Sequence, residues 1–311
     1  DITGIGSNLL TINGVSELHG AEHTILPDMI EVGSFIGMAA MNRSSITIKN
    51  VSYDNLGIIP ECFRRLGIKL EQRGDDIFVP EVGAGRTGLY IDAIKKVAPQ
   101  ITDRPIFAGV IGPFSLSGRL MDVNEIMILC YEEPELVHAV LDKTTGFITE
   151  YAKAFKEAGA NGVVMAEPLA GLLPPDLVAE FSTQYVKRIV DAIQDDEFIV
   201  VYHNCGSSVV KAAEAVVDTG ARAFHFGNAI DMADIMPLIP SDRIVMGNVD
   251  PAGEIRFGTP ESIREKTFEV MGKCCKYPNF VISTGCDVPP MSPWENIDAF
   301  FAAVDEFYAQ Q

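Results

Sequence analysis

The chain has 311 residues, of which 47% are hydrophobic and 22% charged, a balance that supports one large buried core and a single domain over residues 1–311. Its formal net charge of -19 argues against nucleic acid or an anionic membrane surface as a partner, because both bind clustered Lys and Arg. No apolar run is long enough to span a bilayer, and the N-terminus lacks a signal-peptide pattern, so a cytoplasmic protein is expected.

The six cysteines occur at irregular spacings. In a chain of this length they do not resemble a secreted disulfide framework, so reduced thiols with at most a metal-binding role are expected. The first residue is Asp1 rather than Met, which leaves room for a preceding N-terminal segment.

The N-terminal part contains both helical and extended patterns. Apolar residues recur near helical spacing over Thr24–Asn42 and alternate over Ser45–Lys49, which predicts a helix followed by a strand. A second helix is predicted over Asp54–Leu66 and a short strand over Ile77–Val82. Residues 1–44 are interpreted as an N-terminal extension that adds helical structure to the main domain.

The sequence GAGRTG at Gly83–Gly88 matches the spacing of a dinucleotide-binding fingerprint. That fingerprint requires an uninterrupted strand before the glycines and an acidic residue about twenty positions later. Here Pro80 interrupts the strand, and the acidic candidate Asp103 lies in the loop sequence TDRP. A surface turn is therefore favoured over a nucleotide site.

From Ile106 onward, strands and helices alternate regularly. The predicted strands are Ile106–Val110, Gly162–Ala166, Phe198–Tyr202, Arg222–Phe226, Arg243–Met246 and Phe280–Ser283, and the predicted helices are Asn124–Ala158, one starting at Leu177, Val209–Asp218, Met232–Leu238, Pro260–Lys276 and Pro293–Ala309. Together with Ser45–Lys49 and Ile77–Val79, eight strands separated by helices predict an α/β fold, specifically a (β/α)8 TIM barrel.

The apolar run from Phe198 to Tyr202 ends in His203, Asn204 and Cys205. Residues two apart on a strand share a face, so the His203 and Cys205 side chains are expected to project together from the strand's C-terminal end. An HxC pattern is expected by chance roughly once in ten such chains, so the pattern alone is weak evidence for a metal site. Its place at a strand end beside Gly206 strengthens the interpretation.

Active sites of such barrels lie at the C-terminal ends of the strands. Residues at those positions include Cys286, which follows a strand through Thr284 and Gly285 and so is expected on the same rim as His203 and Cys205. One imidazole and two thiolates leave a fourth tetrahedral position open, as in catalytic zinc sites. The alternative is that the three are unrelated polar rim residues.

Two further rim residues have open interpretations. Glu167 follows a strand and precedes Pro168, so it is a candidate fourth zinc ligand, general acid or helix-capping group. His225 is a candidate hydrogen-bond donor to a cofactor, or else a partly buried histidine with satisfied hydrogen bonds. The rim set is completed by Asn248, Asp250 and Asp287, taken as cofactor-binding candidates.

The segments YHNCG, GNVDP and STGCDVPPMSPWENIDAF resemble the uroporphyrinogen decarboxylase superfamily, and within it the branch of methylcobamide:coenzyme M methyltransferases. The similarity covers about two-thirds of the chain, from about Ile106 to the C-terminus. It implies a (β/α)8 barrel with a zinc ion held by His203, Cys205 and Cys286, and Glu167 and His225 are taken as the catalytic candidates beside that ion.

The resemblance also implies the reaction. A methyl group would pass from a methylcobamide, a methylated corrinoid carried by a partner protein, to a small-molecule acceptor, either a thiol such as coenzyme M or tetrahydrofolate. With tetrahydrofolate as acceptor, Asn248 and Asp250 would contact a pterin-like edge, although GNVDP is equally compatible with a structural turn.

The sequence departs from the decarboxylases of the superfamily in two respects. It lacks their N-terminal arginine-rich motif, and its charge of -19 is poorly suited to an octa-anionic porphyrinogen. Both features favour methyl transfer. The alternatives are a uroporphyrinogen-type decarboxylase and a non-catalytic corrinoid-binding barrel.

Overall fold

The computed structural model describes residues 2–4, 9–17, 20, 22, 25–41, 44–80 and 87–310. The chain divides into two compact units, residues 1–88 and residues 89–311. This division differs from the predicted single domain with residues 1–44 as an extension. The loop predicted at Gly83–Gly88 lies largely outside the described residues, since only Thr87 and Gly88 are described.

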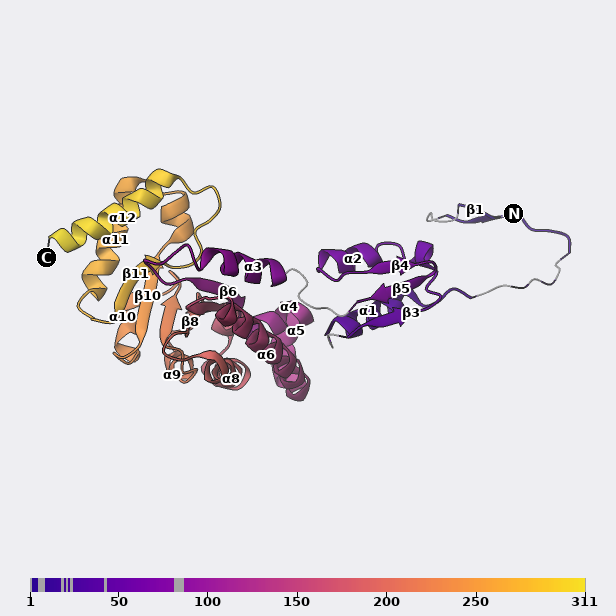
Figure 1. Ribbon diagram of the computed structural model, residues 1–311, viewed down its shortest axis with the longest axis horizontal. Helices are drawn as coiled ribbons and strands as arrows, with labels where there is room; N and C mark the ends of the chain where they lie inside the picture. The colour runs from indigo at the N-terminus through magenta and orange to yellow at the C-terminus, as the bar shows by residue number, and fades with distance from the viewer. Residues whose placement is uncertain are drawn as a thin grey trace. The chain divides into compact units, whose positions relative to one another are not determined.

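The first unit contains a small antiparallel sheet with the strand order β3-β5-β4 (Figure 1). Its elements are β1 (Ile2–Thr3), β2 (Thr11–Ile12), α1 (Met29–Met41), β3 (Ile46–Ile48), the short turn η1 (Tyr53–Asn55), α2 (Ile59–Arg65), β4 (Glu71–Arg73) and β5 (Asp76–Val79). Val32 and Ile36 of α1 pack with Ile77 and Val79 of β5 in a separate core.

The prediction that the extended segments near residues 46 and 77 are the first two barrel strands is wrong, because both belong to this antiparallel sheet. Alternating apolar residues do not distinguish parallel from antiparallel pairing. The missed signal is the two-residue connection between β4 and β5, where Gly74 has a φ of 67°. Glycine at a positive φ is typical of tight hairpins.

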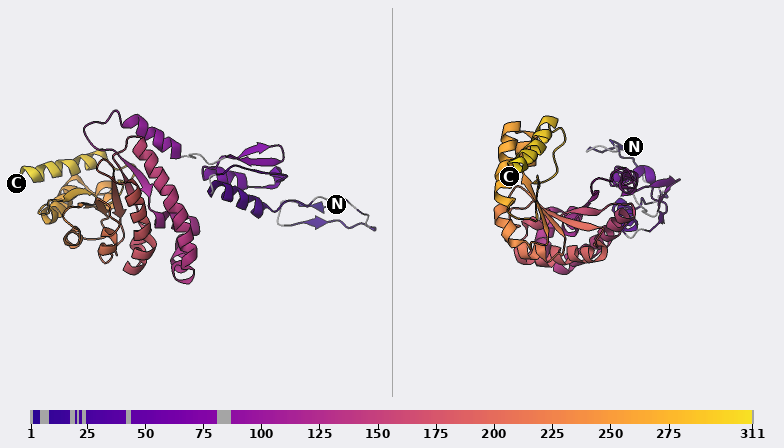
Figure 2. Two further views of the ribbon diagram at one scale, coloured as in Figure 1. Left: turned by 60° about the horizontal axis from the view of Figure 1, so that its bottom comes forward. Right: turned by 60° about the vertical axis from the view of Figure 1, so that its left-hand side comes forward.

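The second unit is a β/α unit of six parallel strands whose spatial order, β11-β10-β9-β8-β7-β6, follows the sequence. The strands are β6 (Phe107–Ile111), β7 (Gly162–Ala166), β8 (Ile199–Asn204), β9 (Ala223–Phe226), β10 (Ile244–Val249) and β11 (Phe280–Thr284). Within the described residues, the parallel sheet has these six strands rather than eight. Figure 2 shows the helices of this unit along the outer side of the curved sheet.

Those helices and helical turns lie between successive strands, except the first, which precedes β6, and the last, which follows β11. They are α3 (Thr87–Val97), α4 (Pro113–Met121), α5 (Val123–Glu132), α6 (Pro134–Glu157), η2 (Leu169–Leu172), α7 (Pro175–Val178), η3 (Ala179–Thr183), α8 (Gln184–Ile193), α9 (Ala213–Val217), α10 (Met232–Ile235), η4 (Met236–Leu238), η5 (Pro251–Arg256), α11 (Pro260–Cys274) and α12 (Trp294–Ala309). The main core lies between the strands and the helix layer, and includes Tyr202, Phe224 and Phe226.

Two predicted segments between β6 and β7 are corrected by the structure. The stretch before Asn124, for which no helix was predicted, forms α4, with Pro113 in its first turn, where a missing N–H costs no hydrogen bond. The single long helix expected over Asn124–Ala158 is two helices, α5 and α6, because Pro134 cannot continue the first one.

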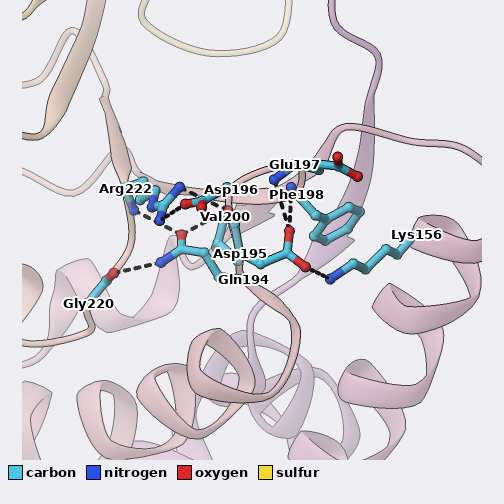
Figure 3. Close-up of polar contacts among 9 residues, drawn as sticks. All are labelled: Lys156, Gln194, Asp195, Asp196, Glu197, Phe198, Val200, Gly220 and Arg222. Atoms are coloured by element: carbon cyan, nitrogen blue, oxygen red, sulfur yellow. Dashed lines mark hydrogen bonds and ion pairs between the residues drawn. The ribbon is translucent and has the colours of Figure 1, made fainter.

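The N-terminal ends of β8 and β9 are joined by a polar cluster that Figure 3 shows. The Gln194 side-chain oxygen accepts hydrogen bonds from the backbone N–H groups of Val200 and Arg222, both at 3.1 Å. Asp195 forms an ion pair with Lys156, and Arg222 donates to the Asp195 carbonyl oxygen at 2.9 Å. This end of the sheet is therefore fixed by structural contacts, which leaves the opposite end for chemistry.

Candidate metal centre

Three metal-competent side chains meet at the C-terminal ends of two strands. His203 is the penultimate residue of β8, Cys205 follows the same strand, and Cys286 follows β11. Their ligand atoms all lie within 4.8 Å of one another, and His203 Nε2 is 3.5 Å from Cys286 Sγ. The structure thus brings together the three residues that the sequence indicated as metal ligands.

The hydrogen bond of His203 determines which ring nitrogen is available. Its Nδ1 lies 3.1 Å from the carbonyl oxygen of His225, and a carbonyl oxygen only accepts, so Nδ1 carries the proton. Burial is the main effect that lowers the pKa of His203 to about 4, and the nearby His225 contributes a smaller effect in the same direction. The ring is therefore neutral at pH 7. Nε2 then presents its lone pair toward Cys286, as a metal ligand must.

The thiols of this cluster are half-buried. Burial, together with the neighbouring Cys286, raises the pKa of the Cys205 thiol. A nearby divalent cation would reverse that effect, because metal coordination deprotonates a thiol. One imidazole nitrogen and two sulfur atoms form a donor set that suits Zn²⁺, and three protein ligands are typical of catalytic rather than structural zinc.

His225 lies next to His203 on the neighbouring strand β9, with ring centroids 4.7 Å apart. Its Nε2 donates to the carbonyl oxygen of Thr284 at 2.7 Å, and Ser283 Oγ lies 3.3 Å from the same nitrogen. Burial lowers the pKa of His225. The predicted donor nitrogen is therefore engaged with the chain segment that carries Cys286.

Glu167 faces away from the cluster. Ala166 is in register with His203, so the next residue, Glu167, points to the opposite side of the sheet, toward α4. Its carboxylate accepts hydrogen bonds from the N–H groups of Phe114 at 2.8 Å and Ser115 at 2.9 Å. These contacts correspond to the helix-capping interpretation, since the carboxylate binds the N-terminus of α4.

Glu167 is fully buried, and burial raises its pKa to about 7 despite the hydrogen bonds that it accepts. Ser182 Oγ is a third donor, at 3.3 Å. Of the described residues, only His203, Cys205 and Cys286 form a group close enough to share a cation, and Glu167 is outside that group.

Asn248 and Asp250 make structural contacts. The amide nitrogen of Asn248 donates to the carbonyl oxygens of Gly227 at 2.9 Å and Ile230 at 2.8 Å, which holds the loop after β9. Asp250 caps η5 by accepting from two backbone N–H groups, each at 2.9 Å. These contacts correspond to the structural turn that the GNVDP sequence also allowed.

Asp287 is exposed beside the cluster. Its negative charge raises the pKa of both His203 and His225, opposing the larger effect of burial. Of the three residues predicted to bind a cofactor, Asn248 is buried, Asp250 is half-buried and Asp287 is exposed.

Sequence reasoning missed the glycines that allow close approach in this region. A Cβ atom at Gly227 would lie 2.5 Å from the Cβ atom of Cys205, and one at Gly285 would lie 2.6 Å from the backbone nitrogen of Asn228. Both glycines directly follow strands, and a glycine at a strand end is the signal for close backbone approach that could have identified them.

The described part of the chain contains no helix that is both long enough and apolar enough to cross a membrane.

The parallel strands follow one another in sequence order, and a histidine and two cysteines meet at their C-terminal ends. These features define an α/β protein of the barrel class with a metal-competent rim. The chain belongs to the uroporphyrinogen decarboxylase (URO-D) family, whose model matches residues 68–307. This match confirms the family and the barrel fold class predicted from the sequence.

Relatives of this family include both methyltransferases and decarboxylases. The methylcobamide:CoM methyltransferase MtbA of Methanosarcina acetivorans is 29% identical over 216 residues, which cover 68% of this chain and 62% of the relative. A uroporphyrinogen decarboxylase of Prochlorococcus marinus is 28% identical over 231 residues, 70% of this chain and 64% of the relative. A solved methyltransferase structure from Methanosarcina mazei superposes with a TM-score of 0.66 at 25% identity, covering 79% of this chain and 77% of that one.

The N-terminal part is similar to a different family. The EPSP synthase (3-phosphoshikimate 1-carboxyvinyltransferase) model matches residues 1–119, a range that includes the whole first unit. The UDP-N-acetylglucosamine 1-carboxyvinyltransferase of Bacteroides thetaiotaomicron is 84% identical over 91 residues. That match covers 29% of this chain and only 21% of the relative, so the chain spans about a fifth of these enzymes.

Proposed function

We propose that the second unit is a zinc-dependent methyltransferase that moves a methyl group from a methylated corrinoid, carried by a partner protein, to a small-molecule acceptor. The acceptor is a thiol such as coenzyme M, or tetrahydrofolate. The observation that carries the proposal is the convergence of His203, Cys205 and Cys286 within 4.8 Å at the rim of the sheet.

His203 Nε2, Cys205 Sγ and Cys286 Sγ would hold the zinc ion. When bound, zinc would lower the pKa of an acceptor thiol and keep it as a nucleophilic thiolate at neutral pH. The chain's own contribution is positioning. The Nδ1–H bond of His203 fixes its ring orientation, and the half-buried thiols remain approachable from the rim.

The family and the charge of the chain support this reaction class. Two methyltransferases among the similar proteins match 68% and 79% of the chain. The net charge of -19 disfavours a substrate with many carboxylates, such as a porphyrinogen. All six cysteines are free, and the proposed site needs reduced thiols, so the reaction is proposed to take place in the cytoplasm.

Metal content is the first test. The purified protein is expected to contain about one zinc ion per chain, and Cys205→Ser and Cys286→Ala are expected to lose it. Cys62→Ser serves as a matched control, since Cys62 is an exposed cysteine of α2 in the first unit. Wild-type protein without stoichiometric zinc, or full activity in Cys205→Ser, would contradict the proposal.

The second test identifies the acceptor. Wild type and Cys286→Ala are incubated with methylcobalamin and either coenzyme M or tetrahydrofolate, and formation of cob(I)alamin is followed by absorbance. Growth of that species with one acceptor in the wild type only is the expected result. Absence of turnover with both acceptors would favour a non-catalytic corrinoid-binding protein, whereas release of CO₂ from a porphyrinogen would favour a decarboxylase.

A further inference from the structure

We infer that β9, which contributes no metal ligand, and Gly227, which directly follows it, position all three ligands of the proposed zinc site, and that His225 and Gly227 are the positioning residues. The inference rests on the proposed function, because it assigns roles toward the metal of that site. β9 lies between β8, which carries His203 and is followed by Cys205, and β10, which pairs with β11, the strand that precedes Cys286.

The first contact is between backbone and ligand. The carbonyl oxygen of His225 accepts the Nδ1–H of His203 at 3.1 Å. This bond fixes the tautomer in which Nδ1 carries the proton and Nε2 keeps a free lone pair for a metal ion. It also fixes the plane of the ring. Because the acceptor is a backbone atom within a paired strand, the orientation of His203 depends on the register between β8 and β9.

The second contact reaches the segment of Cys286. The ring Nε2 of His225 donates to the carbonyl oxygen of Thr284 at 2.7 Å, across the intervening strand β10. Thr284 Oγ1 in turn donates to the carbonyl oxygen of Cys286 at 2.8 Å. The His225 ring thus holds the turn that presents Cys286, and it does so from the strand next to His203.

The third contact is a close approach to Cys205. The backbone N–H of Gly227 donates to the carbonyl oxygen of Asn204 at 3.1 Å, directly before Cys205. A Cβ atom at Gly227 would lie 2.5 Å from Cys205 Cβ and 2.6 Å from Cys205 Cα. Only glycine therefore allows this spacing without a shift of the backbone that carries the ligand.

The main experiment compares His225→Gln with His225→Asn. Glutamine can place its amide N–H where His225 Nε2 lies, whereas asparagine carries the same group one bond short of Thr284. Metal affinity is measured by competition with a chromophoric chelator, and Co²⁺ replaces zinc so that thiolate-to-metal charge transfer reports the bound sulfurs. His225→Asn is expected to bind about 10- to 100-fold more weakly and with a reduced Cys286 contribution, and His225→Gln to remain within a few-fold of wild type.

A metal-free readout separates positioning from general stability. The ¹⁵N shifts of the His203 ring in the metal-free protein are expected to show the Nδ1–H tautomer in wild type and in both His225 variants, because its acceptor is a backbone atom. The metal-free His225→Gln and His225→Asn variants are expected to have similar unfolding temperatures. The difference in metal affinity would then reflect the hydrogen bond to Thr284 that asparagine is too short to form.

Gly227→Ala tests the third contact, with Gly109→Ala as a matched control. A Cβ atom at Gly109 meets nothing within 4 Å. Gly227→Ala is expected to weaken Co²⁺ binding at least tenfold and to alter the charge-transfer band, whereas Gly109→Ala binds like wild type. If Gly227→Ala does not fold, the His225 pair remains decisive.

The outcomes distinguish this inference from the proposed function. Wild-type protein that binds no stoichiometric metal would overturn the proposed function and this inference with it. Wild-type protein that binds metal, with His225→Asn equal to His225→Gln in affinity and Co²⁺ spectrum, would overturn the role of His225 alone and leave the proposed zinc site standing.

Discussion

Replacing Glu167 by glutamine tests how a buried carboxylate stabilises the second unit. The carboxylate accepts from two backbone N–H groups of α4 at 2.8 and 2.9 Å. Glutamine has one oxygen, so one of these buried N–H groups would face the NH₂ group and lose its acceptor. Leaving a buried donor unsatisfied costs about 1–3 kcal/mol, which is the loss of stability expected for Glu167→Gln at pH 5.

The loss of stability caused by Glu167→Gln is expected to depend on pH. Burial raises the folded-state pKa of Glu167 from 4.5 to about 7, so the stability that its proton contributes is fully present below pH 4.5 and is lost as pH rises through 7. At about 1.4 kcal/mol per pH unit, the loss amounts to about 3 kcal/mol in the wild type. Glutamine does not titrate, so the difference in unfolding free energy between wild type and Glu167→Gln should narrow or close by pH 8.

The assay is urea unfolding at pH 5, 6, 7 and 8, followed by circular dichroism and by the fluorescence of Trp294. Trp294 is the sole tryptophan and begins α12, so its signal reports the second unit. Glu150→Gln is the control, because that side chain is 56% exposed and its ion pair should contribute under about 1 kcal/mol. A difference in unfolding free energy between wild type and Glu167→Gln that widens as pH rises would refute the reasoning. It would mean that the hydrogen bonds to Glu167 lower its pKa by more than burial raises it.

Three other changes have expected outcomes. Gly112→Ala would place a Cβ atom 2.4 Å from the Glu167 carboxyl group, so urea unfolding should show a loss of about 2 kcal/mol or more in unfolding free energy. The control Gly109→Ala, whose Cβ atom has no neighbour within 4 Å, should lose about 1 kcal/mol or less. Gln194→Ala removes the acceptor of two backbone N–H groups and should lower the unfolding free energy by about 2 kcal/mol without changing metal content. Asp250→Ala removes a helix cap and should cost about 1 kcal/mol, while turnover in the acceptor panel stays unchanged; a large loss of turnover would restore its role as a cofactor contact.

The strand pattern from Ile106 onward predicted the parallel part of the fold well, because buried parallel strands appear as continuous apolar runs. The first unit was not recognised as separate, because its alternating strands near residues 46 and 77 have the same local pattern as barrel strands. Its hairpin partner β4, with the sequence EQR, has no apolar residue to mark it.

The meeting of His203, Cys205 and Cys286 was predictable because two of these residues share a face and the third follows another strand end. The position of Glu167 could not be predicted, because it depends on the register that pairs Ala166 with His203 and so turns the next residue to the other face of the sheet. The bonds of His225 to Thr284 and of Asn248 to the loop after β9 depend on strand register and loop path, which no local pattern encodes.

The sequential order of the strands also determines when the cluster can exist during synthesis. Each new strand finds its neighbour already made, so the sheet can grow in the direction of translation. His203 and Cys286 are 83 residues apart, which corresponds to roughly 4–17 s at 5–20 residues per second. Throughout that interval the site has only the His203 imidazole and the Cys205 thiol, and the third ligand, Cys286, is made only after β11. Metal capture by all three ligands would thus have to wait until β11 and Cys286 have been made.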